Sequence, residues 1–298
     1  MSSLNNYNPF ARHESHGSYL LAAYRFLAPL SWVLVVVTGI FYSIHSPSDV
    51  YDGHSIWSQF RHHFTGFTVN TIVVQIYWML VLVGQLNYFF HLFSRGEAVV
   101  TRTANIASYY ILNNLFVFAW ILLWTRNHFW GAEVILIAHF IHQHLVFWRI
   151  RTLPPPSHLS VVAAPYAWTL LTLFWNGSVA VNKHNPAADI AANIFIWIIF
   201  VLGAVHMFLT ADDLLGYSLS FLSLGLAVEQ YDHKHIPRQW IFAWVIFAVF
   251  FVDSLYITAT KYIGRPVWWR RDVEPESSDP EKAPLLDDAL PNPAVTTS

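Results

Sequence analysis

The sequence of 298 residues contains no cysteine and few charged residues. Without cysteine, the chain can form no disulfide and can bind no metal through a thiolate. Charged residues make up only 11% of the sequence, whereas a soluble domain carries about a quarter. Hydrophobic residues make up 55% and aromatic residues 17%. This deficit of charge predicts a polytopic membrane protein with short connections between its spans.

Motifs of several functional classes are also missing. The sequence has no phosphate-binding Walker loop, no nucleophile elbow and no pair of carboxylates at catalytic spacing. Its basic residues flank the apolar runs and do not cluster, so nothing supports nucleic-acid binding. We therefore expect no enzyme activity, no cofactor and no metal, and we expect the lipid bilayer to be the main partner of the chain.

Apolar runs predict an all-α protein with eight transmembrane helices. They cover residues 24–44, 67–93, 105–124, 130–149, 161–181, 189–209, 214–228 and 240–262. A helix that crosses a bilayer needs about 20 residues, and the seventh run has only fifteen, so seven spans are the alternative. Three consecutive prolines, Pro154 to Pro156, should break the helix before the fifth span.

These runs divide the chain into three parts. Residues 1–23 form a polar segment, residues 24–262 form the transmembrane bundle, and residues 263–298 form a tail. Much of the tail is acidic and rich in proline, and it has no apolar period. A segment of this composition cannot bury a core, so we expect the tail to be largely disordered.

The basic residues predict the orientation of the spans. With eight spans, both termini and the even-numbered connections share one side, which holds eleven of the sixteen basic residues, and the other side holds five. Without the seventh span, the count becomes eight against seven, with Lys282 left in the tail. Cytoplasmic connections carry an excess of Lys and Arg, so the sequence favours eight spans with both termini in the cytoplasm. The eleven are Arg12, Arg25, Arg95, Arg102, Arg149, Arg151, Lys261, Arg265, Arg270, Arg271 and Lys282.

The fourth span contains three histidines, His139, His142 and His144. At about 100° per residue, His139 and His142 share a face with Gln143 between them, while His144 points away. The three therefore do not form a metal site on one helix. His206 could in principle complete a site, but it lies nearer the cytoplasmic end than His139 does. The simplest interpretation is that His139 and His142 form hydrogen bonds between helices.

Two further features place polar groups at mid-depth. Asn113 and Asn114 lie near the middle of the third span, and Asp253 lies near the middle of the eighth. An isolated carboxylate in the bilayer is costly, so Asp253 must be protonated or paired. The hypothesis is an intramembrane polar site of His139, Asn113, Asn114 and Asp253 that binds protons or substrate, with one structural hydrogen bond as the alternative.

A short pattern in the tail concerns localisation. Glu281, Leu285 and Leu286 match the acidic dileucine signal E-x-x-x-L-L, which clathrin adaptors read in cytoplasmic tails. Half of the sixteen histidines fall on the side away from the cytoplasm, and an acidic lumen would protonate many of them. Both features favour a vacuolar or endosomal membrane over the plasma membrane or another endomembrane.

The second span carries a recognisable pattern of polar and aromatic residues. Residues Asn70, Gln75, Tyr77, Trp78, Gln85 and Tyr88, followed later by the run Gln239–Ala243, resemble a family of fungal multi-spanning membrane proteins defined by a conserved domain of unknown function. The resemblance covers residues 55–265, and it implies a fungal source and an eight-helix bundle. It implies no catalytic residue.

Three classes of function remain compatible with the sequence. The first is a small-solute or proton-coupled transporter of an endomembrane compartment, which we favour narrowly. The second is a non-catalytic membrane subunit or scaffold whose polar residues hold helices together. The third is a histidine-dependent membrane enzyme, which has the least support because no complete catalytic set is present.

Overall fold

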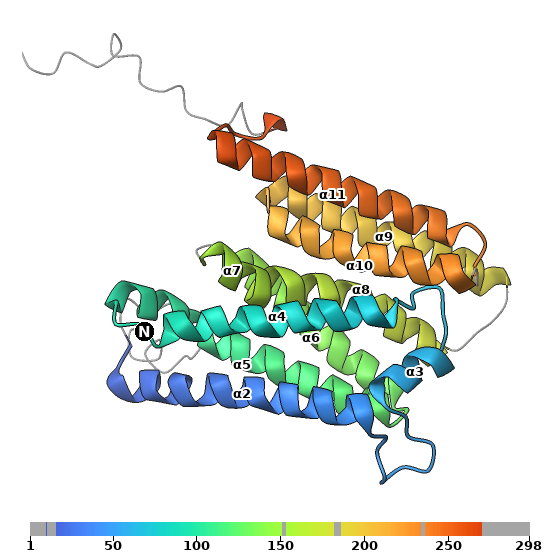
Figure 1. The fold of residues 1–298 in the computed structure, drawn as a ribbon, viewed down its shortest axis with the longest axis horizontal. Helices are drawn as coiled ribbons and strands as arrows, with labels where there is room; N and C mark the ends of the chain where they lie inside the picture. Colours follow the sequence, from blue (N-terminus) through green and yellow to red (C-terminus); the bar gives the residue numbers. More distant parts are fainter. Residues whose placement is uncertain (1–9, 11–15, 151–152, 182–185, 234–235, 270–298) are drawn as a thin grey trace, which may run out of the picture. The chain divides into compact units, whose positions relative to one another are not determined.

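A computed structural model describes Phe10 and residues 16–150, 153–181, 186–233 and 236–269, and these residues contain helices and no strand. The fold is therefore all-α, as predicted (Figure 1). The helices are α2 (Ser18–Ile44), α3 (Ile56–His62), α4 (Thr71–Leu92), α5 (Glu97–Thr125), α6 (Phe129–Arg149), α7 (Pro155–His158), the π-helical turn η1 (Leu159–Ala163), α8 (Ala164–Val181), α9 (Pro186–Thr210), α10 (Asp213–His233) and α11 (Gln239–Ile263).

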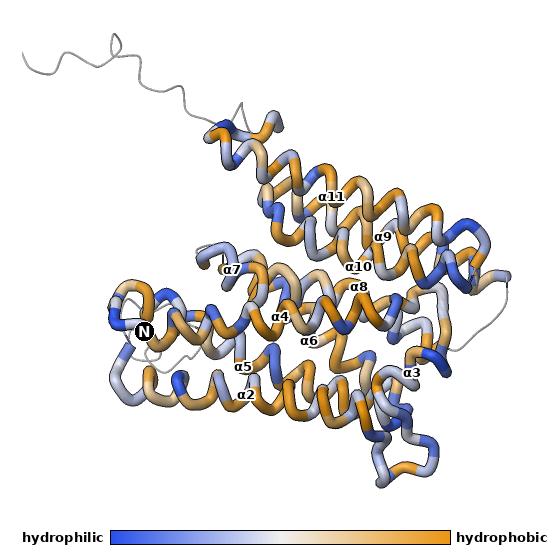
Figure 2. Tube along the Cα trace, in the orientation of Figure 1, coloured by the Kyte–Doolittle hydropathy of each residue, from blue (hydrophilic) through white to orange (hydrophobic). Residues whose placement is uncertain are grey.

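Six helical segments in the described part of the chain are long and apolar enough to cross a membrane, judged by length and composition. They are α2, α4, α5, the continuous segment Pro155–Val181, α9 and α11. Apolar residues run along the lengths of these helices (Figure 2). Helices α6 and α10 have 21 residues each. At about 1.5 Å per residue, each reaches about 31 Å, similar to a hydrocarbon core of about 30 Å.

Helix α10 is longer than the fifteen residues expected of the seventh apolar run. Polar residues at its end lower its hydropathy but remain helical because they are bonded inside the protein. The side-chain amide of Gln230 donates to the carbonyl of Thr65 at 2.9 Å, and the carboxylate of Glu229 accepts from the side chain of Asn70 at 3.0 Å. The end of α10 is thereby tied to the start of α4.

Helix α5 is the centre of the first half of the chain. It packs against α2, α3, α4 and α6. Buried tyrosines join it to its neighbours: the hydroxyl of Tyr110 donates to Gln85 on α4 at 3.0 Å, and that of Tyr24 on α2 lies 2.9 Å from Ser108. Helix α8 has a similar role farther along, since it packs against α6, α9 and α10.

The helix breaks before the fifth span, as predicted, since α6 ends at Arg149 and α7 begins only at Pro155. The prolines are nevertheless partly helical, because Pro155 and Pro156 occupy the first positions of α7, where a missing N–H costs nothing. Pro165 distorts the helix farther along. In the π-helical turn, the amide of Ala164 donates to the carbonyl of Leu159. The carbonyl of Ser160 would be paired next, with Pro165, which has no N–H. The side chain of Gln85 donates to that carbonyl at 3.2 Å.

The chain divides into two compact units, residues 1–257 and residues 258–298. The first unit contains every helix from α2 to α10 and most of α11. The described part of the second unit holds the end of α11 and the pair Trp268 and Trp269, whose ring centroids lie 5.6 Å apart edge to face.

Candidate functional site

His139 begins a buried chain of hydrogen bonds. Its Nε2 donates to Oδ1 of Asn113 on α5 at 2.8 Å, and the side-chain amide of Gln143 donates to the same oxygen. Nδ2 of Asn113 donates to Oδ1 of Asn114 at 3.1 Å. Nδ2 of Asn114 then donates to Oγ of Ser31 on α2 at 3.0 Å. We call these five residues the asparagine network. It joins α6, α5 and α2 near their middles.

The asparagine network is almost completely removed from solvent. His139 is 1% exposed, Asn113 is 3% exposed and Asn114 is 2% exposed. An amide oxygen can only accept, so the bond to Asn113 places the proton of His139 on Nε2. The structure therefore brings together three of the predicted site residues. None of the five lines either of the two cavities described below. This arrangement is typical of bonds that hold helices together.

His142 shares the face of His139 but does not join the network. It is 9% exposed, and neither of its ring nitrogens has a partner among the described residues. Its ring lies against aromatic side chains, with centroid distances of 5.7 Å to Phe116 and 6.0 Å to Tyr109. The shared helix face predicted from the sequence is thus present, but the two histidines have different surroundings.

Asp253 does not take part in the predicted site. Its side chain is exposed on α11 and makes no hydrogen bond or ion pair with a described residue. The next residue, Ser254, is fully buried and donates to the carbonyl of Phe250. One residue turns a helix by about 100°, so the buried face of α11 passes through Ser254 and leaves Asp253 outside. The position of Asp253 in the sequence gives its depth in the membrane but not the rotation of α11 about its own axis.

His144, which points away from His139, meets His206. The hydroxyl of Tyr166 lies 2.9 Å from Nε2 of His206 and 3.3 Å from Nδ1 of His144. The two histidine nitrogens are 3.3 Å apart. Nδ1 of His206 lies 2.6 Å from the carbonyl of Leu202, so Nδ1 carries the proton and Nε2 accepts from Tyr166. This cluster joins α6, α8 and α9. It was not predicted, because the 100° step along a helix shows that His144 points away from His139 but not which residue it meets.

The acid that faces the interior is Glu133, four residues into α6. Its carboxylate accepts from the side-chain amide of Asn176 on α8 at 2.8 Å, and Asn176 also donates to the carbonyl of Phe129 at 3.0 Å. Gly177, which has no side chain, provides space for this carboxylate, since a Cβ there would lie 3.2 Å from it. The signal for Glu133 in the sequence is an acid inside a predicted span, but its position along that span does not show which way the side chain faces.

Glu133 lines a cavity of about 760 Å³ between α6, α8 and α9. We call it the Glu133 cavity. It contains a second carboxylate, Asp189, and the hydroxyls of Thr65 and Ser178, which are 2.8 Å apart. None of its described lining residues is a lysine, arginine or histidine, while Lys183 and His184, next to Val181 in the sequence, lie outside the described residues. Its aromatic lining residues are Phe67, Trp130, Phe174 and Phe195.

The connection between α2 and α4 packs onto the bundle through α3, which contacts α5 and α2. Arg126 at the end of α5 binds Asp49 at 2.9 Å and the hydroxyl of Tyr42 at 2.9 Å. The bond to Arg126 holds the pKa of the exposed Asp49 carboxyl below its ordinary value. Burial, followed by the charges of the neighbouring histidines, lowers the pKa of His63.

No group of three or more His, Asp or Glu residues with metal-binding geometry occurs in the described ranges.

Helices α9, α10 and α11 form the last part of the first unit, with α10 packed on α4, α8 and α9. A comparison with protein families concerns this part of the chain. Residues 189–286 match the model of a family described as "Fungal protein of unknown function (DUF1774)".

The predicted resemblance to a fungal family defined by a domain of unknown function is confirmed for residues 189–286. The matched region contains His206, Asp253 and the run Gln239–Ala243, whereas the pattern in α4 lies outside it. The matched region is shorter than the predicted 55–265 at its start and extends farther into the tail. No curated protein and no solved structure matches the chain. Glu281, Leu285 and Leu286 fall in the matched region but outside the described residues.

Proposed function

We propose that the protein is an eight-span membrane protein with both termini in the cytoplasm. Eight helical segments of at least 21 residues support this count in the described part of the chain, including the doubtful seventh. With eight spans, eleven of the sixteen basic residues lie on the cytoplasmic side. The α3 end of the helices then faces the lumen or the outside.

We further propose that the protein carries small organic cations and that the Glu133 cavity is their site. The observation that carries this proposal is a cavity whose described lining residues supply two carboxylates, several aromatic rings and no basic side chain. A carboxylate pairs with an ammonium group, and aromatic faces attract cations, most strongly where water is excluded. The volume lies within the range of about 300–1,000 Å³ that is typical of small-molecule sites.

The position of Glu133 also allows transport of the solute to be coupled to transport of protons. It lies about 6 Å from the start of α6, at 1.5 Å per residue, so it can exchange protons with the water at that membrane surface. A carboxylate that is paired with either a proton or a cation binds the two in competition. Movement of the solute into the lumen can then be driven by movement of protons out of the lumen.

The experiment is uptake of radiolabelled tetraethylammonium into proteoliposomes with an imposed pH gradient. Glu133→Gln removes the charge but keeps an oxygen that accepts from Asn176, so the helix contact remains. Tetraethylammonium has no N–H to donate, so Glu133 attracts it by charge alone. At about 5 Å and an effective dielectric constant of about 20, this attraction is about 3 kcal/mol, and its loss predicts at least a tenfold fall in uptake. Asp253→Asn is the matched control, because the same chemical change on the exposed face of α11 should leave uptake unchanged.

Two results contradict the proposal. One is wild-type uptake by Glu133→Gln, and the other is a loss of uptake in Asp253→Asn alone. Mannitol, a neutral solute, serves as the control for leak in every preparation. Folding is checked by size-exclusion chromatography, so that a low rate is not mistaken for misfolded protein.

A non-catalytic membrane subunit is the second candidate function. The asparagine network favours it, since its members are buried, bonded to one another and outside both cavities. Under this hypothesis, neither Glu133→Gln nor His139→Ala changes uptake, and only the amount of folded protein falls. We propose no enzyme activity for either candidate.

We also propose that the protein is sorted to a vacuolar or endosomal membrane through Glu281, Leu285 and Leu286.

A further inference from the structure

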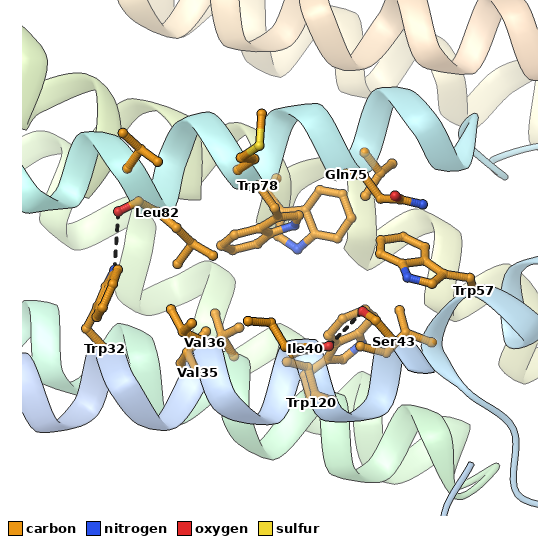
Figure 3. Close-up of a pocket in the computed structure, with 18 of the residues that line it drawn as sticks. Trp32, Val35, Val36, Ile40, Ser43, Trp57, Gln75, Trp78, Leu82 and Trp120 are labelled. Carbon is orange, nitrogen blue, oxygen red and sulfur yellow. Dashed lines mark hydrogen bonds between the residues drawn. The ribbon is translucent and has the colours of Figure 1, made fainter. Parts of the chain in front are cut away.

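A second cavity of about 500 Å³ lies between α2 and α4, with α5 behind it and α3 at one end (Figure 3). We call it the α2–α4 groove. None of its lining residues is charged. Five of them are tryptophans, and most of the others are aliphatic; the tryptophans are Trp32, Trp57, Trp78, Trp120 and Trp168. A charged solute would therefore lose its hydration here and gain no ion pair.

The groove has two different ends. At one end, the indole of Trp32 on α2 donates to the carbonyl of Leu82 on α4 at 3.3 Å and bridges the two helices (Figure 3). At the other end, Trp57 on α3 and Gln75 on α4 lie close to each other across the opening (Figure 3). Ser43 lies on α2 at this second end and donates to the carbonyl of Gly39. Polar atoms free to bond a ligand thus collect at the α3 end.

Two side chains at the α3 end have polar atoms available for a ligand. Trp57 lines the groove and is half-buried, and its indole N–H makes no hydrogen bond within the described ranges. The side-chain amide of Gln75, which is exposed, makes none there either. A hydroxyl group between these two side chains can accept from the indole of Trp57 and donate to the amide oxygen of Gln75.

The length of the groove matches one leaflet of a bilayer. Its lining residues on α2 run from Trp32 to Ile44, which is about 18 Å of helix axis, and half of the hydrocarbon core is about 15 Å. The outward faces beside it are apolar, since Val37 and Ile40 on α2 and Met79 and Val83 on α4 are all 58–59% exposed. The mouth therefore opens toward lipid.

From these observations we propose that the α2–α4 groove binds one uncharged, hydroxyl-bearing lipid with a rigid ring body, that is, a sterol. Its hydroxyl lies at the α3 end and its body lies between the flat tryptophan rings and the branched side chains of Val35, Val36 and Ile40. A rigid body loses little conformational entropy on binding, so a lining without charge can hold it. This site is separate from the Glu133 cavity, with which it shares no lining residue.

The test uses a photoactivatable sterol with a free hydroxyl, added to the full-length protein in nanodiscs. Gly39 lines the groove, and a Cβ there would meet nothing within 4 Å. Gly39→Leu therefore fills the groove without a clash, and it exchanges glycine for a better helix former. We expect this variant to lose crosslinking to α2 and α4 at least fivefold and to lose the rise in melting temperature that sterol gives the wild type.

Two further variants sharpen the test. Gly131→Leu is the matched control, because Gly131 is an exposed glycine of α6 outside the groove and a Cβ there makes only ordinary contacts. It should crosslink as the wild type does. Trp57→Phe keeps the aromatic ring but removes the N–H, and the loss of one hydrogen bond should weaken sterol binding about 2- to 10-fold.

Three outcomes overturn the proposal. Equal crosslinking of photoactivatable phosphatidylcholine, lost in the same way in Gly39→Leu, shows that the groove holds only surrounding lipid. Stronger labelling by photoactivatable diacylglycerol than by sterol excludes the rigid ring body. A change of oligomeric mass in Gly39→Leu, with no sterol-dependent crosslink in the wild type, shows that a second copy of the chain covers the groove.

Discussion

Replacing Asn113 by leucine tests whether the asparagine network holds the helices together. The substitution removes the oxygen that accepts from His139 and Gln143 and the amide that donates to Asn114. Three hydrogen bonds are lost. Bonds between transmembrane helices average about 0.6 kcal/mol and reach about 1.7 kcal/mol. The free energy of unfolding should therefore fall by about 2 kcal/mol, with about 5 kcal/mol as the upper bound.

The assay is reversible unfolding in mixed micelles, followed by tryptophan fluorescence. Leu115→Ala is the control on the same helix, because Leu115 is 43% exposed and makes no side-chain hydrogen bond; it should cost less than about 1 kcal/mol. In a double-mutant cycle, His139→Leu and Asn113→Leu should cost less together than the sum of the two. The difference should lie near the energy of one bond, about 0.6–1.7 kcal/mol.

Two results would refute this reasoning. A loss below about 0.5 kcal/mol, with the two substitutions additive, shows that the bonds contribute nothing measurable. Normal stability of Asn113→Leu with uptake of tetraethylammonium abolished shows that the network belongs to the path of the solute. The same protein samples should be used for both measurements, so that rate and stability are compared directly.

Three other predictions follow from separate parts of the chain. Leu285→Ala with Leu286→Ala should move a fluorescently tagged protein away from the vacuole, and an unchanged distribution means that the dileucine match is accidental. Tyr166→Phe removes the donor to His206 and should lower the free energy of unfolding by about 1 kcal/mol, and no loss in the unfolding assay contradicts the assigned bond. The pKa of His63 is lowered from 6.5, so the folded state prefers its neutral form; stability is complete above about pH 6.5 and falls below it. The protection factors of backbone amides near residues 54–64, that is, exchange rates corrected for the intrinsic pH dependence, should therefore fall between about pH 6.5 and pH 5, and less so in His63→Gln.

The all-α membrane architecture was determined by the sequence itself. Each helix must satisfy its own backbone in lipid, so long apolar runs mark helices without knowledge of their partners. The direction of the α6 histidines was predictable for the same reason, because it depends on one helix only. The 100° step per residue placed His139 and His142 on one face. The length of α10 was not predictable in this way, because Gln230 and Glu229 remain helical through bonds to a segment far away in the sequence.

The composition of the candidate sites depends on tertiary structure. Depth in the membrane can be counted from the sequence, and it correctly placed His139 beside Asn113. The rotation of one helix against another cannot be counted, because it is set by packing between distant segments. That rotation leaves Asp253 exposed, turns Glu133 toward Asn176 and separates α2 from α4 enough to form the groove. The sequence alone thus determined the helices and their polar residues, and only the packing of those helices decided which polar residues face a cavity.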